Sequence, residues 1–104
     1  MYATVRRYEG IDKDRVAEVT KKFGESLTPR MSKLPGFGGY FLIEAGEGVM
    51  TSINLFETSD QAHESTRVAA TWIREEKLET VLPNTPKITA GEVVVHELNG
   101  ALKA

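Results

Sequence analysis

The middle of the chain constrains the fold most, because it predicts a β-hairpin placed between two strand–helix units. Two strand-forming runs flank Gly46, Glu47 and Gly48, and glycine readily adopts the positive φ angles that tight turns need. A further strand and helix precede the hairpin, and a helix and strand follow it. The predicted strands cover residues 2–8, 37–45, 49–57 and 88–98. The order βαββαβ predicts an α+β, ferredoxin-like fold: a four-stranded antiparallel sheet with two helices on one face.

Local signals set the ends of the two predicted helices. The first helix carries apolar residues at spacings of three and four up to Leu34, and Pro29 should kink or break it near Thr28. The second helix begins at Thr58, which forms a capping-box pattern with Gln61. Prolines after Leu82 should end that helix. The whole chain, residues 1–104, is expected to form a single domain.

Large apolar residues occur on both faces of the predicted sheet. In the third strand Ile53 and Leu55 alternate with Met50, Asn54 and Phe56. Two helices can cover only one face, so the other face needs a partner, and we expect a homodimer in which two sheets pack into an α/β barrel. With Ile53 and Leu55 under the helices, Asn54 would point to the dimer side. Its amide would either bond across that interface, the favoured structural role, or face a polar cavity.

Composition excludes several classes of function. The 104 residues include no cysteine, so a disulfide, a thiol nucleophile and a thiolate metal site are excluded. The net charge of −2 does not favour nucleic acid. We expect no membrane partner, since no run approaches the ~20 apolar residues of a membrane helix, and a cytoplasmic location by default. The two histidines show no metal-ligand spacing, and the glycines precede a strand instead of a phosphate-binding helix, so no metal or cofactor is predicted.

Two aromatic side chains of the second helix are candidate site residues. His63 and Trp72 are nine positions apart, which places them on opposite sides of a helix, so they cannot both line one pocket. His63 is better explained as a helix-margin residue in partial contact with solvent than as a ligand or base. Trp72 is better explained as a packing anchor, although it could also form the wall of an aromatic pocket.

The first two strands contribute two further candidates. Arg6 and Arg7 point to opposite faces, so one of them points toward a pocket or interface. A buried arginine needs a carboxylate, and an internal ion pair is the simpler interpretation. The alternative is that Arg6 holds an anionic or phenolate oxygen of a ligand. Tyr40 could donate a proton or hydrogen bond, although strand packing is its commoner use. Carboxylates on neighbouring strands are those of Glu44, Glu57, Glu92 and Glu97.

Four segments together resemble the antibiotic biosynthesis monooxygenase-like proteins of the dimeric α/β-barrel superfamily. They are Pro35-Gly36-Phe37, Gly39-Tyr40-Phe41-Leu42, Phe56-Glu57-Thr58 and Gly91-Glu92-Val93-Val94-Val95-His96-Glu97. The resemblance spans about residues 2–98. It implies a dimer, and a pocket in each subunit between the sheet and the helices. Some members of the family oxygenate polycyclic aromatic phenols without metal or flavin. Haem-degrading members pair a first-strand Asn with a Trp and a His, and this first strand has no Asn, so haem degradation is not expected.

Two functions remain open at this point. The first is a cofactor-independent monooxygenase for a small aromatic or quinol-like substrate, with Arg6, Tyr40, Trp72 and His63 as candidate catalytic residues. The second is a non-catalytic dimer that binds a small apolar metabolite or is simply a structural module with a filled core. Small residues on the second helix either bring the helix close to the sheet or leave room for a ligand: Ala62, Ser65, Ala69 and Ala70.

Overall fold

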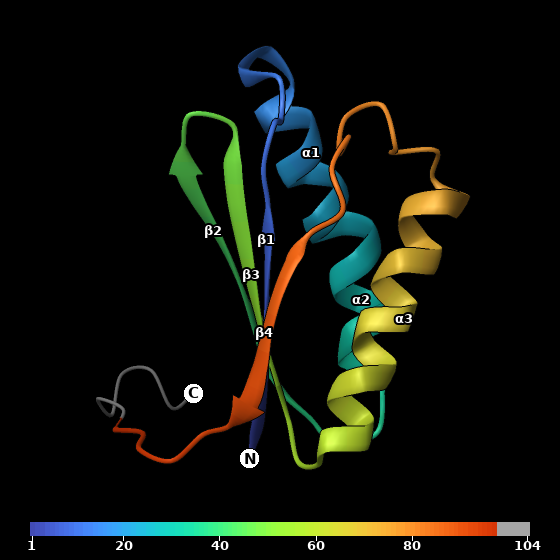
Figure 1. Ribbon diagram of the computed structural model, residues 1–104. Helices are drawn as coiled ribbons and strands as arrows, with labels where there is room; N and C mark the ends of the chain where they lie inside the picture. The colour runs from blue at the N-terminus through green and yellow to red at the C-terminus, as the bar shows by residue number, and fades with distance from the viewer. Residues whose placement is uncertain (98–104) are drawn as a thin grey trace.

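The computed structural model describes residues 1–97, and these form the predicted antiparallel sheet with helices on one face (Figure 1). The strand order is β2-β3-β1-β4, and each neighbouring pair is antiparallel. This order is that of a ferredoxin-like fold, which confirms the prediction. The strands are β1 (Tyr2–Tyr8), β2 (Phe37–Gly46), β3 (Val49–Phe56) and β4 (Lys87–Glu92).

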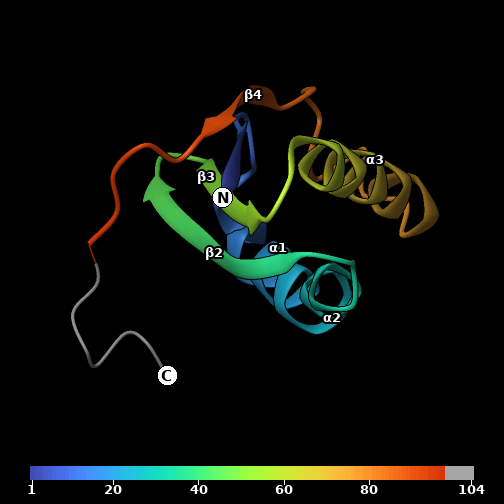
Figure 2. The ribbon, with the colours of Figure 1, turned by 90° about the horizontal axis from the view of Figure 1, so that it is seen from below.

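Two helical regions cover the same face of the sheet (Figure 2). No helix within residues 1–97 is both long enough and apolar enough to cross a membrane. The first region is a nearly continuous run of four helical pieces, and the second is one long helix. The four pieces of the first region are the 3₁₀ turn η1 (Lys13–Arg15), α1 (Val16–Lys22), the π-helical turn η2 (Phe23–Leu27) and α2 (Thr28–Ser32). The long helix of the second region is α3 (Ser59–Glu75), which follows the hairpin.

The irregularity predicted near Thr28 takes the form of the π-helical turn η2. The backbone N–H of Thr28 donates to the carbonyl of Phe23, five residues back, and its hydroxyl donates to the same oxygen at 2.9 Å. Pro29, which has no N–H to donate, follows as one of the first residues of α2. The widened turn therefore lets the chain pass Pro29 without leaving the helical path.

The start of α3 is the predicted capping box. The backbone N–H of Gln61 donates to the hydroxyl of Thr58 at 3.2 Å, and the N–H of Thr58 donates to the Gln61 side-chain oxygen at 3.1 Å. These two bonds satisfy backbone donors that have no partner inside the helix. The helix therefore begins where the sequence predicted.

The end of α3 was predicted wrongly. The helix ends at Glu75 and does not continue to Leu82. Lys77 has a φ of 56°, and the N–H of Leu78 donates to the carbonyl of Ile73 at 2.9 Å. This is the Schellman arrangement of a helix C-terminus, here built on lysine in place of the usual glycine. The chain turns at this point and buries Leu78 in the core.

The prediction for the last strand was also wrong at its end. β4 stops at Glu92, whereas the sequence suggested residue 98, which lies outside the described residues. In the sheet β4 pairs with β1, and Glu92 lies opposite Tyr2 at the beginning of β1. Beyond it the N–H of Val93 donates to the carbonyl of Met1 at 2.9 Å. The valines that follow favour a strand, but β1 offers no further residues to pair with.

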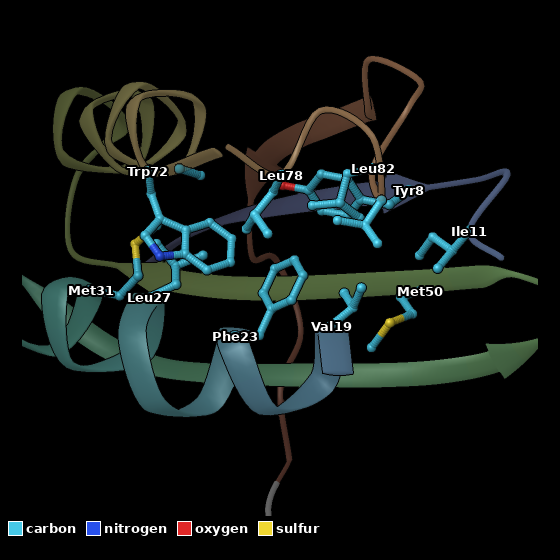
Figure 3. Close-up of a cluster of buried hydrophobic side chains, with 12 residues drawn as sticks. Tyr8, Ile11, Val19, Phe23, Leu27, Met31, Met50, Trp72, Leu78 and Leu82 are labelled. Atoms are coloured by element: carbon cyan, nitrogen blue, oxygen red, sulfur yellow. The ribbon is translucent and has the colours of Figure 1, made fainter. Parts of the chain in front are cut away.

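The core lies between the sheet and the helices (Figure 3). Phe23 is fully buried at its centre, with its ring centroid 5.0 Å from that of Trp72 and 5.6 Å from that of Tyr8. Trp72 reaches down from α3 toward Met31 and Leu27 of the first helical region (Figure 3). The core therefore joins both helical regions to the sheet.

The helix-facing side of β3 is the opposite of the one predicted. Met50, Asn54 and Phe56 lie buried under the helices, while Ile53 and Leu55 are half-buried on the other face. The predicted role of Asn54 on the dimer side is therefore corrected, because its amide faces the interior. The alternation could not distinguish the two faces, since both carry apolar side chains.

Candidate functional site

Six polar side chains gather on the helix-facing side of the sheet. Paired residues in a sheet share a face, and Asn54 of β3 lies opposite Thr4 of β1 and Tyr40 of β2. In the next row along β1, Arg6 lies opposite Ser52. Tyr40 is half-buried, and the others are at most 1% exposed. We call this group the polar patch: Thr4, Arg6, Tyr40, Ser52 and Asn54 from the sheet, with Ser65 from α3.

The guanidinium of Arg6 lies at the centre of the polar patch and has no carboxylate partner. It is 1% exposed, and Nη1 donates to the hydroxyl of Thr66 at 3.2 Å and to that of Ser65 at 3.5 Å, both on α3. Its Nε and Nη2 atoms are buried and have no partner within residues 1–97. The neighbouring Arg7 points outward and pairs with Glu9 at 2.9 Å. Arg6 is therefore the inward-pointing arginine of the pair.

The ion pair predicted for the buried arginine is absent among residues 1–97. The four candidate carboxylates lie on exposed residues: Glu44, Glu57, Glu92 and Glu97. A buried charge without a counter-charge costs several kcal/mol by order of magnitude. An apolar side chain would fill the position of Arg6 at less cost, so packing alone does not account for an arginine there.

Other polar atoms around Arg6 also have no partner within the described residues. These are the hydroxyl of Tyr40, the hydroxyl of Thr4 and the Oδ1 atom of Asn54. The Nδ2 group of Asn54 donates weakly, at 3.5 Å, to Ser52. Most buried polar groups in proteins are hydrogen-bonded, and leaving one unsatisfied costs about 1–3 kcal/mol. A cluster of such atoms around one cation suits the binding of a polar or anionic group.

The tyrosines near Arg6 are held in their neutral form. Burial raises the pKa of Tyr40 and of Tyr8. The nearby positive charge of Arg6 lowers both, and a polar side-chain contact with Arg6 also lowers the pKa of Tyr8, but these effects offset only part of the rise. At neutral pH the Tyr40 hydroxyl therefore keeps its proton and is a hydrogen-bond donor, not a base. Together Arg6 and Tyr40 offer one positive charge and one neutral donor to an oxygen atom.

Trp72 belongs to the apolar core. It is fully buried, stacks at a tilt against Phe23, and its Nε1–H donates to the hydroxyl of Ser26 at 2.8 Å. That bond joins α3 to the π-helical turn η2. Its position is that of a packing anchor between the two helical regions.

His63 lies outside the polar patch. It is exposed, with Nδ1 3.5 Å from the hydroxyl of Ser59 and its ring centroid 6.1 Å from that of Tyr2. Of the four candidate residues, the structure therefore brings Arg6 and Tyr40 together and places His63 elsewhere. Within residues 1–97 no group of three histidine, aspartate or glutamate side chains could hold a metal ion.

The sequence analysis did not identify three members of the polar patch as polar neighbours of Arg6: Thr4, Ser52 and Ser65. Thr4 lies two positions before Arg6 in the same strand, so strand alternation alone places both on one face. Ser65 was noted only for its small size, yet its hydroxyl donates to the carbonyl of Ala62 at 2.6 Å and accepts from Arg6. Its part in the patch becomes visible only once α3 is placed over β1.

Apart from the half-buried Tyr40, the residues of the polar patch are closed to solvent in this structure. Arg6, Thr4 and Asn54 are each at most 1% exposed. The hollows on the surface have other linings; one of about 480 Å³ is lined by residues of α1 and η2: Glu18, Lys21, Lys22, Glu25 and Ser26. A ligand must therefore displace part of the helical layer to reach Arg6.

Comparison with known proteins shows the fold. No protein-family model matches the chain, and no curated protein matches it. A monooxygenase from the gene ActVA-Orf6 of Streptomyces coelicolor, in complex with nanaomycin D, superposes with a TM-score of 0.72 at 12% identity, covering 95% of this chain and 92% of that one. A putative antibiotic biosynthesis monooxygenase from Nitrosomonas europaea gives 0.71 at 13% identity, covering 91% and 100%.

Other solved structures share this fold without a named activity. A dimeric ferredoxin-like protein from an uncultured marine organism gives a TM-score of 0.66 at 12% identity, covering 94% of this chain and 98% of that one. A Nitrosomonas europaea protein of unknown function is also similar. Identities this low establish the fold alone. The chain therefore has the ferredoxin-like fold found in structures of antibiotic biosynthesis monooxygenases.

Proposed function

We propose that this protein is a cofactor-independent monooxygenase that acts on a small aromatic or quinol-like substrate held at the polar patch. The observation that carries the proposal is the buried guanidinium of Arg6, whose Nε and Nη2 have no partner within residues 1–97. The unbonded hydroxyl of Tyr40 lies on the same face of the sheet. The fold, shared with structures named as monooxygenases, supports the same function.

Arg6 and Tyr40 would stabilise negative charge on the substrate. A phenol deprotonated at its hydroxyl can pass an electron to O₂, and the two radicals combine as a peroxide on a ring carbon. The peroxide takes up the proton that the hydroxyl released and then loses water, leaving a carbonyl. Overall, phenol plus O₂ gives quinone plus H₂O, so the substrate is oxidised and O₂ is reduced. A fixed cation and donor in a dry site favour the anionic steps.

Oxygen uptake tests this function. Purified protein is incubated with phenol, anthrone and quinol probes in an oxygen-electrode cell, beside Arg6→Met and the matched outward-facing control Arg7→Met. We expect the natural protein and Arg7→Met to accelerate uptake equally. Arg6→Met should lose about 100-fold or more, the range seen when one oxyanion-stabilising donor is removed.

Two results would contradict the proposal. Equal uptake by Arg6→Met and the natural protein would remove Arg6 from the reaction. Binding of a probe without any uptake would favour the alternative, a non-catalytic protein that binds small metabolites.

We propose further that the open face of the sheet joins two copies of the chain. Phe41 and Ile43 of β2 are 56% and 45% exposed there, a large apolar surface for an isolated domain. Light scattering of the purified protein should give a dimer, and Phe41→Glu should give a monomer. Ile88 is exposed and pairs with Arg6, so it lies on the helix-facing side of the sheet, and Ile88→Glu should leave the dimer intact. A natural protein that is monomeric would overturn this assignment.

A further inference from the structure

The two Arg6 nitrogens without a partner lie on one edge of the guanidinium. In an arginine side chain the N–H groups of Nε and Nη2 point in parallel along that edge. Nη1, at the other end of the group, is the nitrogen that bonds to Thr66 and Ser65. Helix α3 therefore holds one end of the guanidinium, while a two-donor fork remains inside the protein without a partner within residues 1–97.

A parallel pair of donors selects for two oxygens on one group. A carboxylate presents two such oxygens at the matching spacing, whereas a phenolate presents one and would use one donor only. Resting on the proposed function, we propose that the substrate is an aromatic carboxylic acid whose carboxylate pairs with the fork of Arg6. Its ring hydroxyl then lies among the unbonded atoms of Tyr40, Asn54 and Thr4, which supply two hydroxyl groups that can each donate or accept and one carbonyl acceptor.

The charge of the site fits a monoanion. Arg6 is the sole basic residue among the buried side chains of residues 1–97. One carboxylate neutralises it when the substrate binds, because the ring hydroxyl is still protonated at that stage. A phosphate dianion would already bring a second negative charge on binding, in a place that solvent does not reach. A neutral amide of the same shape would turn an N–H donor toward the donors of the fork. The polar patch should therefore bind the carboxylate more tightly than the phosphate, because of its charge, and more tightly than the amide, because of its acceptor geometry.

Calorimetric titration with matched probes at pH 7.5 tests the inference. The probes are 2-naphthoate, the neutral isostere 2-naphthamide, the phenol 2-naphthol, and benzoate as a smaller acid; inorganic phosphate tests the alternative anion. We expect 2-naphthoate to bind about 10- to 100-fold more tightly than its amide and than 2-naphthol, the range for hydrogen bonds to a charged partner. Arg7→Met should bind like the natural protein.

Two variants of Arg6 separate charge from geometry. Arg6→Met should lose the preference for 2-naphthoate over its amide. Arg6→Lys keeps the charge but has no fork, so it should weaken 2-naphthoate binding by about 10-fold while remaining better than Arg6→Met. A thermal melt of each variant checks that it is folded, and Arg6→Lys keeps the test usable if Arg6→Met does not fold.

The outcomes distinguish this inference from the proposed function. Tighter binding of 2-naphthol or phosphate than of 2-naphthoate overturns the carboxylate assignment, and in the first case oxygenation of phenols still stands. Failure of both 2-naphthoate and benzoate to bind at millimolar concentration also overturns it. If 2-naphthoate binds through Arg6 but no phenol or quinol supports oxygen uptake, the ligand class stands and the monooxygenase function fails.

Discussion

The same face of the sheet is built in two different ways along its length. Toward the end of β1, Tyr8 packs with Phe23, Met50 and other apolar side chains. Two residues earlier, Arg6 stands among polar groups that lack partners. Both regions are buried by the same helices. The apolar region has the close packing that stabilises a domain, whereas the polar patch has features that cost stability.

This contrast indicates what each region is for. Residues that serve only stability are expected to be packed and satisfied, and the apolar region meets that expectation. Residues that serve binding or catalysis are often poorly packed or lack hydrogen-bond partners, and the stability that they cost is supplied by the rest of the fold. Arg6 and Asn54 are such exceptions, so variants of the two regions should change stability in opposite directions.

The largest effect is expected in the apolar region. Phe23→Ala should lower the free energy of unfolding by about 3–5 kcal/mol, because it removes a fully buried ring and leaves a cavity. Urea denaturation followed by the fluorescence of Trp72, which packs against Phe23, measures the change. The exposed Ile88 offers a control, and Ile88→Ala should change stability by less than about 1 kcal/mol. Equal losses in the two variants would mean that Phe23 is not a core residue.

A change of the opposite sign is expected at Arg6. Arg6→Met should raise the free energy of unfolding by about 1–4 kcal/mol, as found when apolar residues replace buried charges. Ser65 still donates to the carbonyl of Ala62 in the variant, so it keeps a hydrogen bond. Arg7→Met, measured by the same denaturation curves, should leave stability nearly unchanged. A strong loss of stability in Arg6→Met would assign Arg6 to the scaffold and remove the contrast.

The most gradual effect is a dependence on alkaline pH. Burial raises the pKa of Tyr8 and of Tyr40 in the folded protein above the value of about 10 expected in the unfolded chain. Above pH ~10 the unfolded chain therefore loses protons that the folded protein keeps, and stability falls by up to about 1.4 kcal/mol per pH unit for each tyrosine. Below that pH their contribution is fully present.

Denaturation at a series of pH values from 9 to about 12 measures this slope. Tyr40→Phe removes one of the two tyrosines and should make the fall shallower. It also removes a buried hydroxyl that has no partner within residues 1–97, so its stability at pH 7 should not decrease. An unchanged alkaline slope in Tyr40→Phe would show that this hydroxyl titrates normally.

Features with local causes were predictable from the sequence. The turn between β2 and β3 has positive φ angles at Gly46 and Gly48, as its glycines suggested, and also at Glu47. The capping box of Thr58 and Gln61 was found at its predicted place. Each depends on residues that are close in the chain, so nothing distant could override it.

Features decided by distant neighbours were not predictable in the same way. The end of β4 depends on where β1 begins, since Glu92 pairs with Tyr2 at the start of that strand. The end of α3 depends on Lys77 adopting a positive φ, which carries no signal in a lysine. In both places apolar residues continue beyond the end of the element, so the prediction from local propensity made the helix and the strand too long.

The candidate site was predictable only in part. Alternation showed that one of Arg6 and Arg7 must point inward, and Arg6 and Tyr40 do share the polar patch. The partner of Arg6 was not predictable, because hydroxyl groups of α3 took the place expected for a carboxylate. The inward direction of Asn54 was missed because Ile53 and Leu55 were placed under the helices, and both faces of β3 carry apolar side chains.

The π-helical turn η2 has a kinetic consequence for the sealed patch. The hydrogen bonds of η2 span five residues and those of α1 span four, so the regular hydrogen-bond pattern of α1 does not continue through η2. The segment α2 contacts β2, the strand that carries Tyr40, and we expect local opening at η2 and α2 to precede the unfolding of α1 and α3. Amide protons of residues 23–32 should exchange with solvent sooner than those of α3. The rate of this local opening would then set an upper limit on how fast any ligand reaches Arg6.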